Sequence, residues 1–281
     1  MKRKCLKFLL LTIGVVSVLS VKGYCYAEKM AVNVNIKTTI VISNEKKAIA
    51  NDIEVKNIDL RIACRNGNIE EVKKLLDAGA LVNSSDIYGW TPLHEVCNSS
   101  RNIEIVKLLL ANGANPSFFN NKGITPLHMI CNDNKNIEII KLLLNYGANP
   151  NAITNEGCTP LHTVCGISEN DSIITLLLSY GANPNVANRC GQTPLHTACQ
   201  NCKNTKAIKL LLNNNANVNA KNYHGNTPLH IACQYNNKEV VQLLLDYGAD
   251  TKATNNNGST PIQFVDRSKP EISKLLSSWR Q

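Results

Sequence analysis

The chain has 281 residues, a formal net charge of +9 and only 5% aromatic side chains. Five of its basic residues precede the first acidic residue, Glu28, and the remainder carries 25 basic against 21 acidic groups. This mild, scattered excess argues against the basic stripe that follows a phosphate backbone, so we expect no nucleic-acid binding. Few aromatic residues and plentiful Leu, Ile, Asn and Ala favour many small helices over one large mixed core.

An export signal is predicted over residues 1–27. Residues 1–7 are basic, residues 8–21 form an apolar run, and Ala27 follows a short polar stretch, which is the layout of a cleavable secretory signal. The apolar run is shorter than the roughly 20 residues needed to span a bilayer. We therefore expect cleavage after Ala27 and no membrane association beyond the signal. An uncleaved anchor is the alternative.

Residues 28–57 form a separate linker whose structure the pattern leaves open. Apolar and polar residues alternate there as in a β-strand, at Val32, Val34, Ile36, Thr38, Ile40 and Ile42. A lone strand would have nothing to pair with, so a flexible or loosely docked linker is an equal alternative.

Self-similarity with a fixed period characterises residues 58–281. The tetrapeptide Thr-Pro-Leu-His recurs every 34 residues, beginning at Thr91, Thr125, Thr159, Thr193 and Thr227, and a degenerate Thr-Pro-Ile-Gln begins at Thr260. The motif and its period resemble those of the ankyrin-repeat family. The resemblance implies an all-α solenoid of helix-turn-helix units joined by β-hairpins. We expect about seven repeats, including two capping repeats, and a monomer.

The residues of one repeat explain its helices. The hydroxyl of Thr91 can cap a helix, and Pro92 suits the first helical position because its missing N–H costs nothing there. A second helix follows at 103–110 and ends at Gly113, which tolerates the left-handed conformation. An extra residue separates the two helices in four of the repeats. Polar residues replace apolar ones on the outward faces of the end repeats, as caps require, at Glu71, Lys74, Glu271 and Lys274.

Histidine recurs at one motif position, at His94, His128, His162, His196 and His230. Stacked repeats place such positions about 10 Å apart, whereas zinc ligands converge within about 2.3 Å of one ion. We therefore expect no metal site. The family resemblance implies instead that each imidazole bonds locally and ties its repeat to the neighbouring hairpin.

Cysteine recurs three residues after the histidine position, at Cys64, Cys97, Cys131, Cys165, Cys199 and Cys233. We expect these side chains to act as small buried hydrophobes, too far apart for the ~7 Å limit of a disulfide. Only Cys158, Cys190 and Cys202 fall at hairpin or loop positions. Exported proteins usually pair their cysteines, so this thiol ladder hints at a reducing destination.

The hairpin tips are the candidate binding surface. Their residues differ from repeat to repeat on a constant frame, which a recognition surface requires, although neutral drift of exposed positions gives the same pattern. Aromatic and arginine side chains are the preferred anchors of interfaces, and the candidates are Tyr88, Trp90, Arg189, Tyr223 and His224. Phe118 and Phe119 are either a second contact or packing for the hairpin base.

These patterns predict a binding protein rather than an enzyme. Cys190 and His224 share one tip position in adjacent repeats but lack an orienting third group, so we expect no catalytic residue and no cofactor. The leading hypothesis is an exported bacterial scaffold that acts as an effector on a host protein, in the host cytosol. A periplasmic or envelope assembly factor of the bacterium itself is the alternative.

Overall fold

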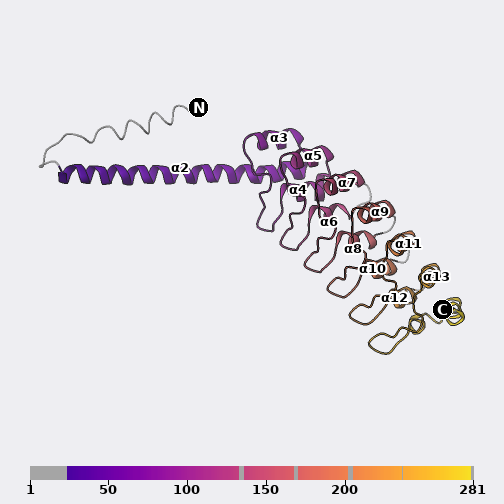
Figure 1. Cartoon of the computed structure of the whole chain (residues 1–281). Helices are drawn as coiled ribbons and strands as arrows, with labels where there is room; N and C mark the ends of the chain where they lie inside the picture. Colours follow the sequence, from indigo (N-terminus) through magenta and orange to yellow (C-terminus); the bar gives the residue numbers. More distant parts are fainter. Residues whose placement is uncertain (1–23, 133–135, 168–169, 202–204, 236, 280–281) are drawn as a thin grey trace. The chain divides into compact units, whose positions relative to one another are not determined.

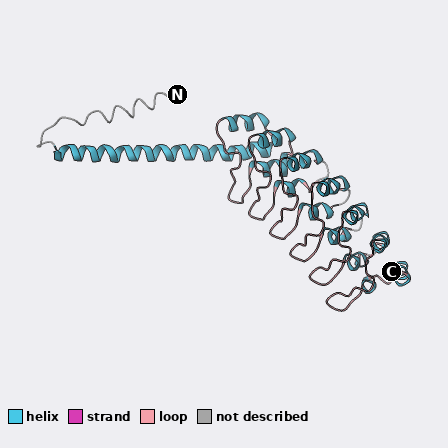
Figure 2. Cartoon of the chain, in the orientation of Figure 1, coloured by secondary structure: helices cyan, strands magenta, loops and turns pink. Residues whose placement is uncertain are grey.

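The computed structural model describes residues 24–132, 136–167, 170–201, 205–235 and 237–279. The chain divides into two compact units, Met1–Glu54 and Val55–Gln281. Helices and loops make up all of the described chain, with no regular strand in those residues (Figure 2). Most of the predicted export signal falls on residues 1–23, outside the described residues.

A long helix, α2 (Tyr24–Asn66), occupies the segment where the pattern allowed a strand. The strand alternative is therefore wrong. This stretch contains neither glycine nor proline and lies between Gly23 and Gly67, so a helix can run uninterrupted and satisfy its own backbone groups without a partner strand. Gly67 ends the helix with a φ of 73°, a value that glycine adopts without strain.

The first repeat lacks the signal that starts the other helices. Ile58-Asp-Leu-Arg61 stands where the later repeats have Thr-Pro-Leu-His, so α2 continues through this point instead of beginning there. From Val55 onward the helix belongs to the second unit, where Leu60 and Cys64 are fully buried.

The second unit is a stack of helix pairs (Figure 1). The last turns of α2 pair with α3 (Ile69–Asp77), and the following pairs are α4 (Pro92–Glu95) with α5 (Ile103–Ala111), α6 (Pro126–Ile130) with α7 (Ile137–Asn145), α8 (Pro160–Cys165) with α9 (Asp171–Ser179), α10 (Pro194–Gln200) with α11 (Thr205–Asn213), α12 (Pro228–Gln234) with α13 (Lys238–Asp246), and a 3₁₀ helix η2 (Pro261–Phe264) with α14 (Pro270–Ser278). First helices contact first helices and second helices contact second helices, which gives two layers.

Each first helix begins at a capping threonine. Thr91 has an extended backbone (φ −89°, ψ 166°), and its side chain accepts a hydrogen bond from the backbone N–H of His94. Pro92 occupies the first helical position, as the motif predicts. At the other end of the repeat, Gly113 has a φ of 83°, and the N–H of Ala114 reaches back to the carbonyl of Leu109 at 2.9 Å. The repeat is therefore closed at both ends by local hydrogen bonds.

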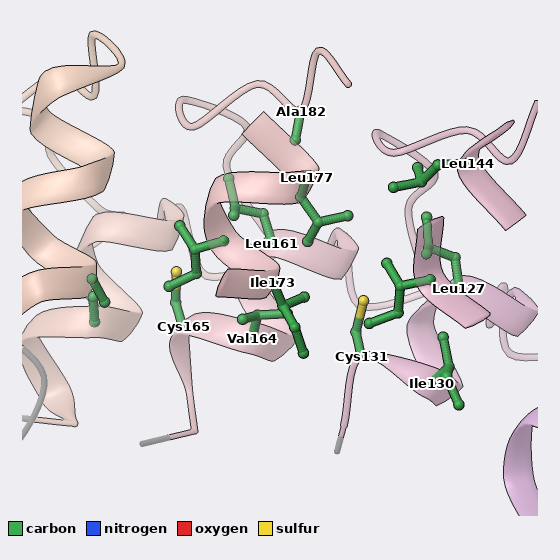
Figure 3. Packing of buried hydrophobic residues seen from close by; sticks show 14 of the residues in the cluster. Leu127, Ile130, Cys131, Leu144, Leu161, Val164, Cys165, Ile173, Leu177 and Ala182 are labelled. Atoms are coloured by element: carbon green, nitrogen blue, oxygen red, sulfur yellow. The ribbon is translucent and has the colours of Figure 1, made fainter. Parts of the chain in front are cut away.

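The core lies between the two layers and repeats with the sequence. Leu127 and Ile130 of α6 are fully buried, as are Leu161 and Val164 of α8, and Figure 3 shows these side chains packed with those of the second helices. A buried cysteine accompanies each group, as in Cys165. The apolar layer thus continues from one repeat into the next.

The cysteine ladder is buried and contains no disulfide. Its six members are all buried, and none of the eight cysteines whose side chains are described forms a disulfide. Burial raises the pKa of Cys64, Cys97 and Cys233 to about 12, so these thiols stay protonated and inert near neutral pH. Cys158 is partly buried and Cys190 is exposed, whereas Cys202 lies outside the described residues.

In the second repeat, the extra residue between the paired helices is absorbed by a π-helical turn. There α4 continues into a π-helix, η1 (Val96–Ser100), and Arg101 follows in the left-handed region with a φ of 49°. The hydroxyl of Ser100 donates a 2.8 Å hydrogen bond to the carbonyl of Cys64 in the preceding repeat. A π-bulge is the usual way for a helix to take one additional residue.

An ion pair joins the first repeat to the second. Glu95 is buried, with its side chain 3% exposed, and Arg65 near the end of α2 covers it. The guanidinium donates from Nη2 to Oε1 at 2.7 Å and from Nε to Oε2 at 3.0 Å, which is the paired geometry that makes such contacts strong. Uncharged residues, beginning with Met129, take the place of Glu95 in the later repeats.

Candidate functional site

Loops between successive helix pairs project in one row (Figure 2). The Asp86 side chain shapes the first loop, because its Oδ1 accepts from the backbone N–H groups of Tyr88 at 2.9 Å and Trp90 at 2.8 Å. Later loops repeat this arrangement around Asn120, Thr154, Asn188, Asn222 and Asn255. The predicted hairpins are therefore tight turns held by side chains, without regular strands.

Backbone hydrogen bonds join each loop to the next. The N–H of Asn121 donates to the carbonyl of Tyr88 at 3.0 Å, and the N–H of Tyr223 donates to that of Cys190 at 3.1 Å. Where asparagine is present, its amide adds a second bond, as from Asn121 Nδ2 to the Ile87 carbonyl at 2.9 Å. The row is consequently a rigid surface rather than a set of independent loops.

The motif histidines fasten the loops to the helices. Nε2 of His94 lies 3.0 Å from the carbonyl oxygen of Ile124, thirty positions later. A carbonyl only accepts, so Nε2 carries the proton and Nδ1 accepts from the N–H of Thr91 at 3.2 Å. The same arrangement recurs at His128, His162, His196 and His230, which meet the carbonyls of Cys158, Gln192, Asn226 and Ser259.

Burial keeps these imidazoles neutral. It lowers the pKa of all five motif histidines, against the opposing effect of the carbonyl hydrogen bond, and brings the pKa of His128 to about 4. A proton on Nδ1 would face the Thr N–H group and abolish that bond. The histidines therefore serve the scaffold and require the uncharged form.

A second ladder, not predicted from the sequence, runs along the base of the loops. Asn151 Nδ2 donates to the Gly181 carbonyl at 2.8 Å, while its Oδ1 accepts from the N–H of Asn183 at 2.7 Å. Equivalent two-way contacts are made by Asn83, Ser117, Asn185 and Asn219. These positions are 34 residues apart, so the repeat period itself was the available signal.

Four of the five predicted anchors are exposed. Tyr88 and Tyr223 show 63% and 70% of their surface, and Arg189 and His224 are also exposed. Trp90 is different, because it is half-buried and its ring centroid lies 6.3 Å from that of His94. Trp90 therefore packs mainly on the base of its loop.

Arg189 and Tyr223 stand at the position where neighbouring loops carry a bonded asparagine. Asn121, Asn155 and Asn256 use their side chains to bind the preceding loop. Asparagine at these tip positions therefore has a structural role. Arginine and tyrosine keep the backbone bond but leave their side chains for other contacts.

The Tyr223 ring lies against the preceding loop. A Cβ placed on Gly191 would come within 2.6 Å of Tyr223 Cδ1, so only glycine permits this approach, and Gly191 also has a φ of 74°. Tyr223 therefore keeps most of its ring surface exposed for a partner while one edge packs on the preceding loop.

Phe118 and Phe119 have different surroundings. Phe118 is half-buried, whereas Phe119 is 66% exposed. The half-buried Phe118 fits the expectation of packing at the hairpin base, whereas the exposed Phe119 is available for contact with a partner.

Open grooves lie away from the loops, on both sides of α11. One of about 520 Å³ separates α11 from α9, and one of about 440 Å³ separates it from α13. Lys206 and Lys209 line both. The first turn of α11 has no acidic residue, unlike that of α5, where Glu104 pairs with Lys107 at 2.7 Å. The second helices are therefore less uniform than their shared leucine pattern indicates.

The described parts of the chain carry neither a metal-binding cluster nor a membrane-spanning helix. Those parts hold no group of three or more His, Cys, Asp or Glu side chains placed to bind a metal ion. None of their helices is both long and apolar enough to cross a membrane.

Comparisons with known proteins agree with this architecture. A family model for ankyrin repeats (3 copies) matches residues 40–120, 97–188 and 163–255. The ankyrin repeat domain of Bcl-3, a member of the IkappaB family, is similar in structure with a TM-score of 0.69 and 28% identity, over 78% of this chain and 98% of that one. The human ASB11 ankyrin repeat domain gives 0.67 and 28%, over 79% and 97%. No match was found among curated protein sequences.

Proposed function

Because the chain belongs to the ankyrin-repeat family, we propose that it is a non-enzymatic scaffold that binds a protein partner through its row of loops. Ankyrin repeat domains generally mediate protein–protein interaction, and their fold is typical of non-catalytic scaffolds. In this chain the helices, histidines and asparagines are occupied in holding the stack together. The loop tips are where side chains of differing chemistry reach solvent.

The observation that carries the proposal is that Arg189 and Tyr223 stand at the tip position where other loops have an asparagine bonded to the preceding loop. Both side chains are exposed on loops that neighbouring loops hold in place. Arginine and tyrosine are the residue types that contribute most binding energy in protein interfaces. Tyr88 presents a third such side chain at the start of the row.

Export is the second part of the proposal. The basic, apolar and polar segments of residues 1–27 support a secretory signal, and the buried cysteine ladder without disulfides supports a reducing destination. Together they favour a bacterial effector that acts on a host protein in the host cytosol. An envelope or periplasmic assembly factor is the alternative, and it shares the signal but not the reducing destination.

Export predicts a defined N-terminus. When the full chain is expressed in a bacterium, mass spectrometry of the secreted or periplasmic protein should find it to begin at Glu28. Soluble cytoplasmic protein that retains Met1 as its only form would contradict the export proposal. Protein that is exported with Met1 retained would favour the uncleaved anchor.

The tip anchors predict where the partner binds. We expect the combined change of Tyr88, Arg189 and Tyr223 to alanine to weaken binding of a captured partner at least tenfold, because each change removes a large exposed contact. The melting temperature should stay nearly constant, since exposed substitutions away from caps and core shift stability by about 0.5 kcal/mol or less. Calorimetric titration and thermal unfolding of the full chain measure the two quantities.

A matched control changes exposed lysines on the second helices. Lys107→Ala, Lys141→Ala and Lys209→Ala, made together, should leave the affinity for the same partner largely intact. If the lysine variant loses the partner and the tip variant keeps it, the binding face is the outer layer and not the row of loops.

A further inference from the structure

The exposed side chains of the loops are not evenly distributed along the row. The six loops are residues 81–90, 115–124 and 149–158, here called the first three loops, and 183–192, 217–226 and 250–259, here called the last three loops. The backbone bonds from loop to loop run through both groups, so the two groups form one continuous surface. Their chemistry nevertheless differs.

The first three loops present large apolar side chains to solvent. Each of these side chains is more than half exposed, namely Leu81 at 56%, Ile87 at 82%, Tyr88 at 63%, Phe119 at 66% and Ile153 at 58%. Folded proteins normally keep such groups apart, and several on neighbouring loops mark an interaction site. The Asp86 carboxylate in this region is already engaged by two backbone N–H groups.

The last three loops present an excess of cations. Arg189, Lys221 and Lys252 supply one exposed cation per loop. The one acidic residue of these segments, Asp250, is half-buried and accepts a hydrogen bond from the backbone N–H of Lys252 at 2.8 Å. The first helices beside them, α10 and α12, are free of acidic residues. Lys221 Nζ donates to the Thr254 carbonyl at 2.8 Å, which fixes its position while leaving further N–H groups for an acceptor.

Arg189 and Tyr223 occupy equivalent positions on adjacent loops. The backbone bond from Tyr223 to Cys190 brings the two loops together, and the exposed His224 adjoins them. An arginine fork binds a carboxylate through two parallel hydrogen bonds, and the tyrosine hydroxyl offers another donor. The group is therefore suited to a carboxylate of a partner.

We propose that the row of loops binds an extended protein segment with two chemically distinct halves. This inference rests on the proposed function. Apolar side chains of the segment lie on the first three loops, and Asp or Glu side chains lie on the last three. Stacked repeats are about 10 Å apart, so the centres of the two groups are about 30 Å apart. An extended chain rises about 3.3 Å per residue, so roughly nine residues separate the two halves.

Selection from a library tests this without a known partner. Random 16-residue peptides displayed on phage are selected on the immobilised full chain, and in parallel on two variants with unchanged melting temperatures. One variant carries Arg189→Glu, Lys221→Glu and Lys252→Glu. The other carries Ile87→Asn, Tyr88→Asn and Phe119→Asn. Affinities of the synthetic consensus peptide are then measured at low and high salt.

The proposal expects wild-type consensus peptides with aromatic or aliphatic residues at one end and Asp or Glu at the other. The charge-reversed variant should bind that peptide at least tenfold more weakly at low salt and should select Lys or Arg in place of the acidic residues. The asparagine variant should keep the acidic preference and lose the apolar one. Absence of enrichment, consensus peptides without acidic residues, or an unchanged consensus on the charge-reversed variant would each overturn the proposal.

These results are separable from the test of the proposed function. One outcome is a captured partner that requires Tyr88, Arg189 and Tyr223 while the selected peptides lack acidic residues. That result supports the scaffold function and contradicts only the two-part partner. A partner whose affinity is unchanged by the three tip substitutions contradicts the row of loops as the binding face.

Discussion

Lowering the pH from 7.5 to 5 will shift urea unfolding of the full chain to markedly lower urea concentrations. Burial lowers the pKa of the five motif histidines in the folded protein, whereas an unfolded histidine titrates near 6.5. Below about pH 6.5 the unfolded chain therefore binds more protons than the folded one. The free energy of unfolding consequently decreases as the pH is lowered. The loss continues down to the folded pKa of each group.

The size of this effect follows from one residue. With a folded pKa of about 4, His128 alone should remove about 2 kcal/mol of stability at pH 5. The other four histidines act in the same direction. Asp266 is held below its usual pKa by hydrogen bonds from Ser268, but that carboxyl titrates at a lower pH, outside this window.

The last repeat supplies a matched control. Gln263 replaces histidine there, and its Oε1 accepts from the N–H of Thr260 at 2.7 Å without any titration. His128→Gln should keep the cap and make the loss of stability between pH 7.5 and 5 smaller by about 2 kcal/mol. Stability that is flat over this range, or an unchanged pH dependence in the variant, would contradict the neutral-histidine account.

Arg65→Ala will lower the free energy of unfolding by about 3 kcal/mol at pH 7.5. The change leaves the Glu95 carboxylate, 3% exposed, without its partner, and breaking one side of a buried ion pair costs about 3–5 kcal/mol. We expect the low end because the Arg65 side chain is 55% exposed and water screens the pair. Urea unfolding with the linear extrapolation measures the difference.

The double variant Arg65→Ala with Glu95→Met is the control. Methionine occupies the matching position in the next repeat, at Met129, so an apolar side chain fits this environment. Removing both charges should recover most of the lost stability. A double variant no more stable than Arg65→Ala would mean that the arginine acts through packing rather than through the charge.

The repeat frame was predictable because a single motif encodes several contacts at once. Thr91 and Pro92 specify where a helix starts, and the period specifies where the next one follows. The strand alternative for residues 32–42 was wrong because alternation alone does not reveal whether a partner strand exists. An uninterrupted run without glycine or proline was the better indicator, and it continues to the end of α2.

The candidate site was only partly predictable. Exposure of Tyr88 and Tyr223 follows from their place in the loops, but the packing of Trp90 on its own repeat depends on a ring contact that spacing does not reveal. The bonded asparagines were harder to recognise, since asparagine in a turn is commonly explained by its local turn propensity. Here its amide also reaches the neighbouring loop, which only the stacked structure shows.

Among the described residues, hydrogen bonds and helix contacts between repeats reach only the adjoining unit, and this makes the length of the array adjustable by recombination. Duplicating or deleting a 34-residue block after the second repeat would recreate the same asparagine, histidine and leucine contacts at the new junction, because each unit offers its neighbour nearly the same surface. The junction between the first and second repeats is the exception. Arg65 and Glu95 form an ion pair there. A block inserted between them would leave the buried Glu95 carboxylate without its partner. Growth or loss of units is therefore tolerated on one side of Glu95 only.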